Sequence, residues 1–474
     1  MRYVSTRGGA PALGFEDVLL AGLARDSGLY VPEAWPQFSA AELRDMAGLT
    51  YAELSVRVMA PFVDGALEQD DFAALVADAY DGFDHRAVAP LVKIGDGEWL
   101  LELFHGPTLA FKDYPLQLVG RLFDHVLARR GERVTLVGAT SGDTGSAAIE
   151  ACRDRAAIDI IILHPKGRVS EVQRRQMTTV DAANVHNIAI DGTFDDCQAL
   201  VKGMFGDAAF RDAMRLSAVN SINWARIMGQ TVYYFAAALA LGAPAREVAF
   251  SVPTGNFGNV YAGYAARQMG LPVAQLVVAT NSNDILARFF ATCEMSARPV
   301  TPTLSPSMDI QVSSNFERLL FDMSGRSGTR VAEAMAAFRE TGVMTVDRQR
   351  LAEICELFDA GTLDDEGTLA AIAAMRADTG LLIDPHSAVG VEVGRARHRD
   401  RLRDGRRDAS QPLVALATAH PAKFPDAVEK ATGIRPELPA RLGDLLTRPE
   451  RVTELPNDPA AVKAHIRARV CVAA

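Results

Sequence analysis

One pattern constrains the fold more than any other: between residues 133 and 280, short β-rich runs alternate with longer stretches that suit helices. The runs are VTLVG, IDIIIL, VHNIAI, EVAFSVP and VAQLVVAT. Strands joined by helical crossovers lie parallel, with helices on both faces of the sheet. The sequence therefore predicts an α/β fold. Because ligands of such sheets bind at the carboxyl ends of the strands, we expect the chemistry in the loops that follow them.

The segments outside this alternation have other patterns. Apolar residues recur at helical spacing in residues 1–84, which predicts a helical N-terminal region. Residues 317–375 are expected to be mostly helical, and the strand-like run PLVALAT at 412–418 precedes a helix that begins near Pro425. Residues 435–459 carry five prolines, which favours a wrapping tail before a short closing helix.

Composition excludes several classes of protein. With 474 residues, 49% hydrophobic and 23% charged, the chain is long and apolar enough to fold into about three domains or lobes. The formal net charge of −10 gives no basic footprint for nucleic acid or anionic lipid. Any anionic ligand must therefore be held by local groups.

Cysteine usage and hydropathy bear on the compartment. The five cysteines are scattered and odd in number, so we expect neither disulfides nor a metal site. The N-terminal MRYVSTRGG leads into no apolar signal core, and the longest apolar stretch, near Val232 to Leu241, is about half a membrane span. The expected location is the cytoplasm, with no membrane partner.

Three loops carry residues suited to chemistry. The first, ELFHGPTLAFKD at 102–113, ends with Lys112 after an aromatic and mostly apolar run. A lysine buried there would be neutral and nucleophilic, because desolvation disfavours the ammonium. The alternative is a lysine that extends from the loop to solvent.

The second loop, GATSGDTGSAA at 138–148, directly follows a β-rich run and opens a helix. Its glycines allow backbone amides to point outward, and Thr140, Ser141 and Thr144 add hydroxyl groups. A carboxylate or phosphate fits such a helix N-terminus. The same residues are also ordinary helix caps and turn formers.

The third loop, SVPTGNFGNVYAG at 251–263, again joins a strand to a helix. It lacks the lysine of a Walker motif, and its glycines do not have dinucleotide spacing, which sets a nicotinamide-dependent dehydrogenase aside. Main-chain N–H groups and the helix dipole would hold a phosphate here. A tight strand-to-helix turn is the alternative.

Taken together, the motifs resemble those of one family. In chain order they are HGPTLAFKD, TSGDTG, NSIN at 220–223, PTGNFGN, SMDIQ at 307–311 and ATAHPAKF at 417–424. This series resembles threonine synthase, of the longer subgroup found in many bacteria and fungi. The resemblance extends over most of the chain, including the helical N-terminal region.

The resemblance implies a pyridoxal 5'-phosphate (PLP) enzyme of fold type II, with two parallel-sheet lobes and helices on both faces of each. Lys112 matches the family lysine that binds the cofactor covalently and then serves as a base. Thr418 matches the residue that meets the pyridine nitrogen. The residues that match the loop for the cofactor phosphate are Gly255, Asn256, Phe257, Gly258 and Asn259, the last of which is often Asp in the family.

The implied reaction converts O-phospho-L-homoserine and water to L-threonine and phosphate. The TSGDTG loop resembles the loop that holds the substrate carboxylate in related enzymes, with Asp143 in place of their Asn. Few cations lie within the motifs to receive the substrate phosphate, and Lys423 and Arg226 are the leading candidates, with Lys166 and Arg168 on another loop. The expected substrate-binding residues are Thr140, Ser141, Asp143, Thr144, Asn223, Arg226 and Lys423.

Other expectations concern histidines, domains and alternatives. For His105, His386 and His420 a structural hydrogen bond to backbone is expected over proton transfer.

The expected domains are a helical region at 1–84, a large cofactor-binding domain at 85–117 and 223–474, and a small domain at 118–222. The alternatives are a serine or threonine dehydratase of the same fold and a ligand-binding relative without activity. The sequence predicts no oligomeric state.

Overall fold

A computed structural model describes residues 1–140, 142–218, 221–406, 408 and 410–470. The chain forms two compact units, and each has its own parallel sheet. The large unit comprises Met1–Ala77, Phe83–His105 and Ser221–Pro436, and the small unit comprises Asp78–Gly82, Gly106–Asn220 and Glu437–Ala474. The three-part domain division expected from the sequence stays a prediction.

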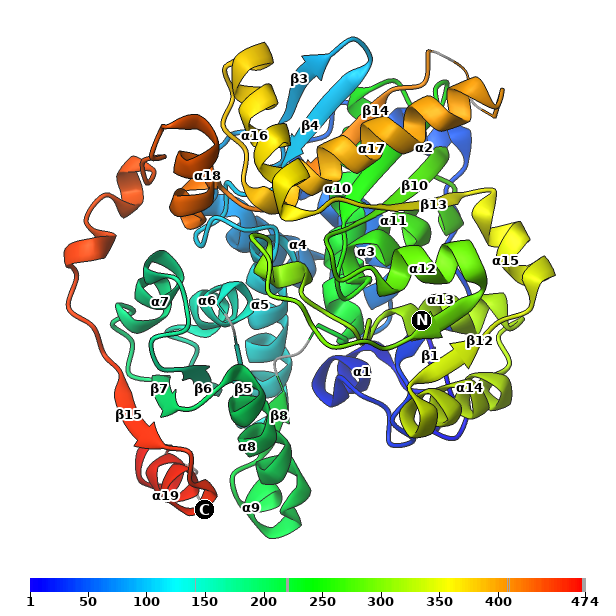
Figure 1. Cartoon of the computed structure of the whole chain (residues 1–474). Coiled ribbons are helices and arrows are strands. Elements are labelled where there is room, and N and C mark those ends of the chain that lie inside the picture. Colours follow the sequence, from blue (N-terminus) through cyan, green and yellow to red (C-terminus); the bar gives the residue numbers. More distant parts are fainter. Residues whose placement is uncertain (141, 219–220, 407, 409, 471–474) are drawn as a thin grey trace. The chain divides into compact units, whose positions relative to one another are not determined.

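The sheet of the small unit has five parallel strands in the order β15-β7-β6-β5-β8 (Figure 1). Its central strand, β6, is buried along its whole length, as its run of isoleucines predicts. The bounds of the strands are Val134–Ala139 (β5), Ile158–Pro165 (β6), Val185–Asp191 (β7), Leu216–Ala218 (β8) and Thr453–Pro456 (β15).

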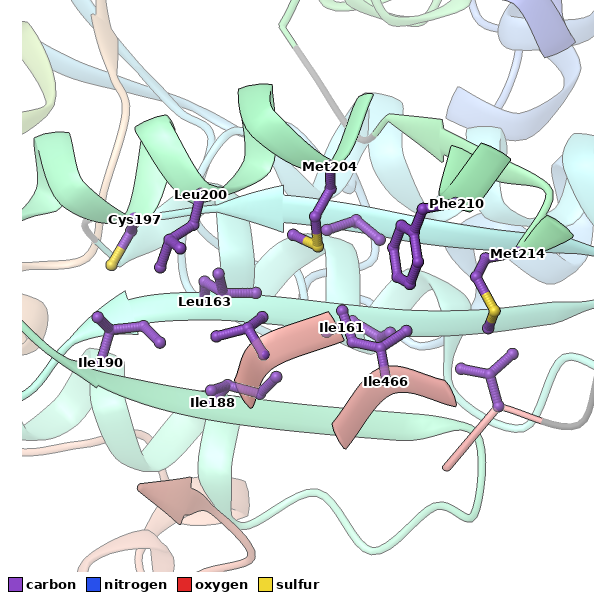
Figure 2. Close-up of a cluster of buried hydrophobic side chains, with 13 residues drawn as sticks. Ile161, Leu163, Ile188, Ile190, Cys197, Leu200, Met204, Phe210, Met214 and Ile466 are labelled. Carbon is purple, nitrogen blue, oxygen red and sulfur yellow. The ribbon is translucent and has the colours of Figure 1, made fainter. Parts of the chain in front are cut away.

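Helices cover both faces of this sheet. Figure 2 shows one face, where Cys197, Leu200 and Met204 of α8 (Phe194–Gly206) point toward Leu163 of β6 and pack with it in one buried cluster. Phe210 of α9 (Ala208–Ala213) and Ile466 of α19 (Pro459–Arg469) complete the cluster. Helix α6 (Asp143–Cys152) packs on β6, and α5 (Asp113–Arg130) and α7 (Glu171–Thr178) pack on α6.

The sheet of the large unit has six strands in the order β13-β10-β9-β14-β4-β3. All neighbours are parallel except β3 and β4, which form an antiparallel hairpin at one edge. The bounds are Leu91–Gly95 (β3), Glu98–Glu102 (β4), Val248–Pro253 (β9), Val273–Thr280 (β10), Phe358–Thr362 (β13) and Leu413–Ala417 (β14).

Helix α17 (Pro385–Arg403) lies along this sheet (Figure 1). Its Val389 and Val393 pack on Val277 and Ala279 of β10. Helices α10 (Trp224–Ala240) and α11 (Gly258–Gln268) pack on each other, and α11 also packs on β9 and β10. The other helices of the large unit, with α4 continuing into the small unit, are Phe15–Ala21 (α1), Ala40–Met46 (α2), Tyr51–Val63 (α3), Gln69–Asp81 (α4), Ile285–Thr292 (α12), Phe316–Met323 (α13), Gly328–Thr341 (α14), Arg348–Cys355 (α15), Asp365–Thr379 (α16) and Pro425–Thr432 (α18).

The expected β-rich runs all form strands, and α18 begins at Pro425 as predicted. Two expectations need correction. The N-terminal region is not wholly helical, because Tyr3–Ser5 (β1) pairs antiparallel with Tyr30–Pro32 (β2). The mostly helical stretch after Glu317 also contains β13, which adds to the edge of the large sheet, and Val343–Thr345 (β12), which pairs with Glu294–Ser296 (β11).

The described part of the chain forms no helix with both the length and the apolar character needed to cross a bilayer.

Candidate active site

The loop before α5 holds Lys112 in a buried position. Lys112 is 9% exposed, and its Nζ lies 5.0 Å from the centre of the Phe111 ring. The loop folds onto Asp113, whose carboxylate accepts hydrogen bonds from the backbone N–H and the hydroxyl of Thr108 at 2.8 and 2.6 Å. Gly106 passes so close to Asp113 that an added Cβ would lie 2.5 Å from the Asp113 Cβ. The lysine is therefore buried, and the solvent-exposed alternative is wrong.

A carboxylate of the next loop pairs with this lysine. Nζ of Lys112 donates to Oδ2 of Asp143 at 3.2 Å, and the Asp143 side chain is buried as well. Lys112 is therefore paired with a buried carboxylate and is not surrounded by apolar groups alone.

The TSGDTG loop follows β5 and begins α6 with Asp143. Oγ1 of Thr140 accepts hydrogen bonds from the N–H groups of Gly142 and Gly145 at 3.0 and 2.9 Å, so this hydroxyl shapes the turn. Thr144 is half-buried in the first turn of α6. Ser141 lies outside the described residues.

In the large unit, the PTGNFGN loop follows β9 and begins α11 at Gly258. Phe257 adopts a left-handed conformation, with φ of 64°, and its ring is buried against Phe316 and Phe358 at centroid distances of 5.3 and 6.0 Å. The ring anchors the turn while the backbone reverses. The first N–H groups of α11 have no acceptor within the helix, because a helix leaves its first turn of donors unpaired.

The SMDIQ segment and the residues after it support this loop. Oγ of Ser313 donates to the carbonyl of Gly255 at 2.7 Å, and the N–H of Asn315 donates to the carbonyl of Asn256 at 3.1 Å. A Cβ on Gly255 would lie 2.9 Å from Cδ1 of Ile310 and 3.1 Å from Cα of Met308, so a larger residue would have to displace this segment. The loop is therefore held in place by the segment 307–315.

Asn259, in the first turn of α11, has a buried N–H donor without a hydrogen-bond partner. Its Oδ1 accepts hydrogen bonds from the hydroxyls of Tyr233 and Tyr234 at 2.6 and 2.9 Å, which fixes the orientation of the amide. Its Nδ2 is buried without a hydrogen-bond partner. An unpaired buried donor is costly, and an anion at the helix N-terminus would satisfy it.

Arg226 in the first turn of α10 is a second unsatisfied group. Its side chain is 4% exposed, and Nε and Nη1 have no hydrogen-bond partner. Burial lowers the pKa of Arg226 to about 10, so the guanidinium is still charged at neutral pH. Asn223 caps the same helix: its Oδ1 accepts from the N–H of Ala225 at 3.0 Å and its Nδ2 donates to the carbonyl of Leu19 at 2.8 Å.

Thr418 directly follows β14 and is 5% exposed. Its N–H donates to Oγ of Ser387 at 3.2 Å, and that hydroxyl also bonds to the carboxylate of Asp384, the N-cap of α17. Lys423, in the short helical turn Pro421–Lys423, is fully buried. The loop after β14 therefore carries both residues away from solvent.

The three histidines have structural partners. Nε2 of His386 accepts from the N–H of Ser307 at 3.2 Å, and Nδ1 of His420 accepts from the N–H of Ala422 at 3.1 Å, as expected. His105 differs, because its Nε2 bonds to the carboxylate of Glu102 at 2.8 Å and not to backbone.

Sequence reasoning missed Gln173 and Gln176 of α7, which contact the two loops of the small unit. Nε2 of Gln173 donates to Oδ1 of Asp143 at 2.8 Å, and Nε2 of Gln176 donates to the carbonyl of Thr108 at 3.0 Å. Two glutamines three positions apart share one helix face, which was the available signal.

Family models cover most of the chain. One described as "Threonine synthase N terminus" matches residues 2–80, one described as "Pyridoxal-phosphate dependent enzyme" matches 85–345, and one described as "Threonine synthase, C-terminal" matches 387–466. A threonine synthase of Pseudomonas aeruginosa is 59% identical over 98% of both chains. The chain belongs to the threonine synthase family.

Other relatives agree. A threonine synthase of Methylobacillus glycogenes is 43% identical over 98% of this chain and 99% of its own length. The crystal structure of PLP-bound threonine synthase from Brucella melitensis is 53% identical, covers 100% of both chains and superimposes with a TM-score of 0.96. The two parallel-sheet α/β architecture expected for the family is thereby confirmed.

The cofactor of this family is pyridoxal 5'-phosphate, and the residues present fit it. The unpaired Nδ2 of Asn259 and the first N–H groups of α11 form a cradle for a phosphate. The buried Lys112 carries a primary amine, a group that reacts with the aldehyde of this cofactor. The glycine at 255 lets the loop lie close to Ile310 and Met308.

Proposed function

We propose that the chain is a threonine synthase that converts O-phospho-L-homoserine and water to L-threonine and phosphate. The observation that carries the proposal is the buried ion pair of Lys112 and Asp143, 3.2 Å apart, in a chain of this family. A buried lysine is costly to keep, and a catalytic amine explains its place.

In the large unit, the backbone N–H groups of residues 255–259 and Nδ2 of Asn259 would hold the phosphate of the cofactor. In the small unit, the Lys112 amine would hold the cofactor covalently. The hydroxyl of Thr418 would bind the pyridine nitrogen, and the hydrogen bond from the Thr418 N–H to Ser387 holds the residue at the end of β14. When bound, pyridoxal phosphate withdraws electrons from the α carbon of an amino acid.

The substrate phosphate is bound by Arg226. Its free Nε and Nη1 donors and its charge suit an oxyanion, and buried donors aimed at an anion give strong, charge-assisted hydrogen bonds. Lys423 adds positive charge. Asn223 supports this site by capping α10, and both ends of its amide are already bonded within the protein.

The substrate carboxylate lies at the start of α6. Thr140 and Thr144 would bind it through their hydroxyls, together with Ser141, which lies outside the described residues, while Asp143 pairs with Lys112. Lys112 takes the proton from the α carbon of the substrate and moves protons in the later steps, in which the γ phosphate leaves and water adds at the β carbon.

The test is product analysis with two substrates. The purified protein is incubated with O-phospho-L-homoserine and, separately, with L-threonine. We expect equal amounts of phosphate and L-threonine from the first and no keto acid from the second. Keto acid from L-threonine without phosphate release from phosphohomoserine would favour the dehydratase alternative, which the two threonine synthase terminal models already disfavour.

A cytoplasmic location, as expected from the sequence, is part of the proposal. It is tested by fractionating cells and locating the protein with an antibody. Recovery in the membrane pellet after washing with high salt would contradict it.

A further inference from the structure

Helix α7 reaches the pair of Lys112 and Asp143 through one side chain that no motif includes. Gln173 is 4% exposed, and its Nε2 donates to Oδ1 of Asp143 at 2.8 Å. The other oxygen of the same carboxylate, Oδ2, accepts the hydrogen bond from Lys112. Each oxygen of Asp143 thus has a donor of its own.

The amide of Gln173 has a fixed orientation. Oγ of Ser170, the N-cap of α7, donates to Oε1 of Gln173 at 2.9 Å and accepts from the N–H of Gln173 at 3.3 Å. Because Oε1 accepts from the hydroxyl, Nε2 is the end that faces Asp143. The chain of bonds runs from Ser170 through Gln173 and Asp143 to Lys112.

The TSGDTG loop is shaped to admit this glutamine. Gly142 has φ of 145°, and a Cβ there would lie 2.5 Å from Cδ of Gln173. A glycine is therefore required at 142 on two counts, its backbone conformation and the space that the glutamine fills.

The position of α7 is itself fixed within the small unit. Oγ1 of Thr178 donates to Oε2 of Glu450 at 2.7 Å, and Nη1 of Arg175 donates to the carbonyl of Arg448 at 3.2 Å. Arg174 also forms an ion pair with Glu450. The helix that carries Gln173 is thus anchored at several points.

We propose that Gln173 is a positioning residue that holds the Asp143 carboxylate against the Lys112 amine, so that the amine is aimed for attack and for proton transfer. This rests on the proposed function, since Lys112 is taken as the catalytic amine. Gln173 acts only through Asp143. A neutral amide suits this role, because it orients the carboxylate without adding a positive charge that would compete with Lys112 for Asp143.

The chain offers a matched control. Gln275 of β10, in the large unit, is 2% exposed, and its Nε2 donates at 2.8 Å to Asp359, which forms an ion pair with Arg401. Gln275, Asp359 and Arg401 thus repeat the arrangement of amide, carboxylate and cation seen in Gln173, Asp143 and Lys112, but without a proposed catalytic lysine. Loss of either glutamine removes one buried amide-to-carboxylate hydrogen bond.

The experiment compares Gln173→Leu with Gln275→Leu. For Gln173→Leu we expect kcat to fall about 10- to 100-fold, the range for a hydrogen bond to a charged group, with KM for phosphohomoserine changed less than about 3-fold. We also expect pyridoxal phosphate added to the cofactor-free protein to react with Lys112 about 10-fold more slowly, followed by absorbance. For Gln275→Leu we expect lower thermal stability but wild-type kcat and loading rate.

A milder variant tests the same inference if Gln173→Leu does not fold. Ser170 is exposed, so Ser170→Ala should fold, and it frees the Gln173 amide to rotate. We expect a fall in kcat of about 3- to 10-fold, against no fall for Thr193→Ala, which removes the N-cap of α8 in the same unit.

Wild-type kcat and loading rate in a folded Gln173→Leu variant would overturn the inference, as would equal losses in Gln275→Leu. If Gln173→Leu does not fold, wild-type kcat in Ser170→Ala would overturn it. The rate at which pyridoxal phosphate reacts with Lys112 can be measured in a protein that has no catalytic turnover. A wild-type protein that makes no threonine, but loads cofactor faster than Gln173→Leu, would refute the proposed function and leave this inference standing.

Discussion

At the scale of single residues, two buried arginines differ in whether their guanidinium donors have hydrogen-bond partners. Burial lowers the pKa of both Arg226 and Arg318 to about 10. Arg318 is fully buried but bonded, since its guanidinium donates to the carbonyls of Tyr30 and Ile222 and to Oδ1 of Asn315. Arg226 has two donors without partners. The contrast supports the proposal that a ligand binds Arg226.

Arg226→Gln tests this reading. The substitution removes the charge and the planar donor pair, so we expect KM for phosphohomoserine to rise about 10- to 100-fold, and the inhibition constant of inorganic phosphate to rise with it. The measurement is steady-state phosphate release at several concentrations of each.

The control for that substitution is Arg57→Gln, since Arg57 lies in the same unit but its side chain is 53% exposed. It should leave both constants unchanged. An unaltered phosphate inhibition constant in Arg226→Gln would assign the substrate phosphate to another cation.

At the scale of elements, the PTGNFGN loop, which is proposed to hold the cofactor phosphate, depends on the segment packed behind it. Gly255 lies against Ile310 and Met308, where a Cβ would be 2.9 Å from Cδ1 of the first and 3.1 Å from Cα of the second. The backbone contact with Met308 cannot be relieved by a rotamer change. The loop and the SMDIQ segment must therefore move together.

For Gly255→Ala we expect the dissociation constant for pyridoxal phosphate to rise about 10-fold or more, because overpacking at this contact displaces the cradle. Fluorescence or absorbance titration of the cofactor-free protein measures it. Gly203→Ala in α8 is the control, since its Cβ meets nothing within 4 Å. Equal affinity in both variants would show that the close approach is relieved without cost.

The same scale shows what sequence predicts and what it does not. β6 and β10 are predictable because apolar runs bounded by turns have few other uses. β13, with the sequence FDAGT, is not, because it is short, contains glycine and is a strand only through its pairing with β10. The motif loops locate Lys112 and Asp143, but Gln173 is a plain helical glutamine until the fold brings it to Asp143.

At the scale of the whole molecule, each unit is assembled from separate segments of the chain. Residues from Glu437 onward follow the entire large unit in sequence but belong to the small unit. There β15 extends the sheet beside β7, and Val462 and Ile466 of α19 enter the buried cluster of Figure 2. The C-terminal segment is thus part of the core of the small unit.

Ile466→Ala should lower the free energy of unfolding by about 2–5 kcal/mol, because the site is 1% exposed and truncation leaves a cavity. Urea denaturation measures it. Leu446→Ala, at a side chain 42% exposed, should change it by less than about 0.5 kcal/mol. Similar values for the two variants would contradict a packed role for α19.

The central claim is that Lys112 is the catalytic amine of a threonine synthase. The most direct measurement is L-threonine formed from O-phospho-L-homoserine by the wild-type protein, by Lys112→Ala and by Lys202→Ala, an exposed lysine of the same unit. We predict equal turnover in the wild type and Lys202→Ala, and none above background in a folded Lys112→Ala. Appreciable threonine from Lys112→Ala would contradict the account.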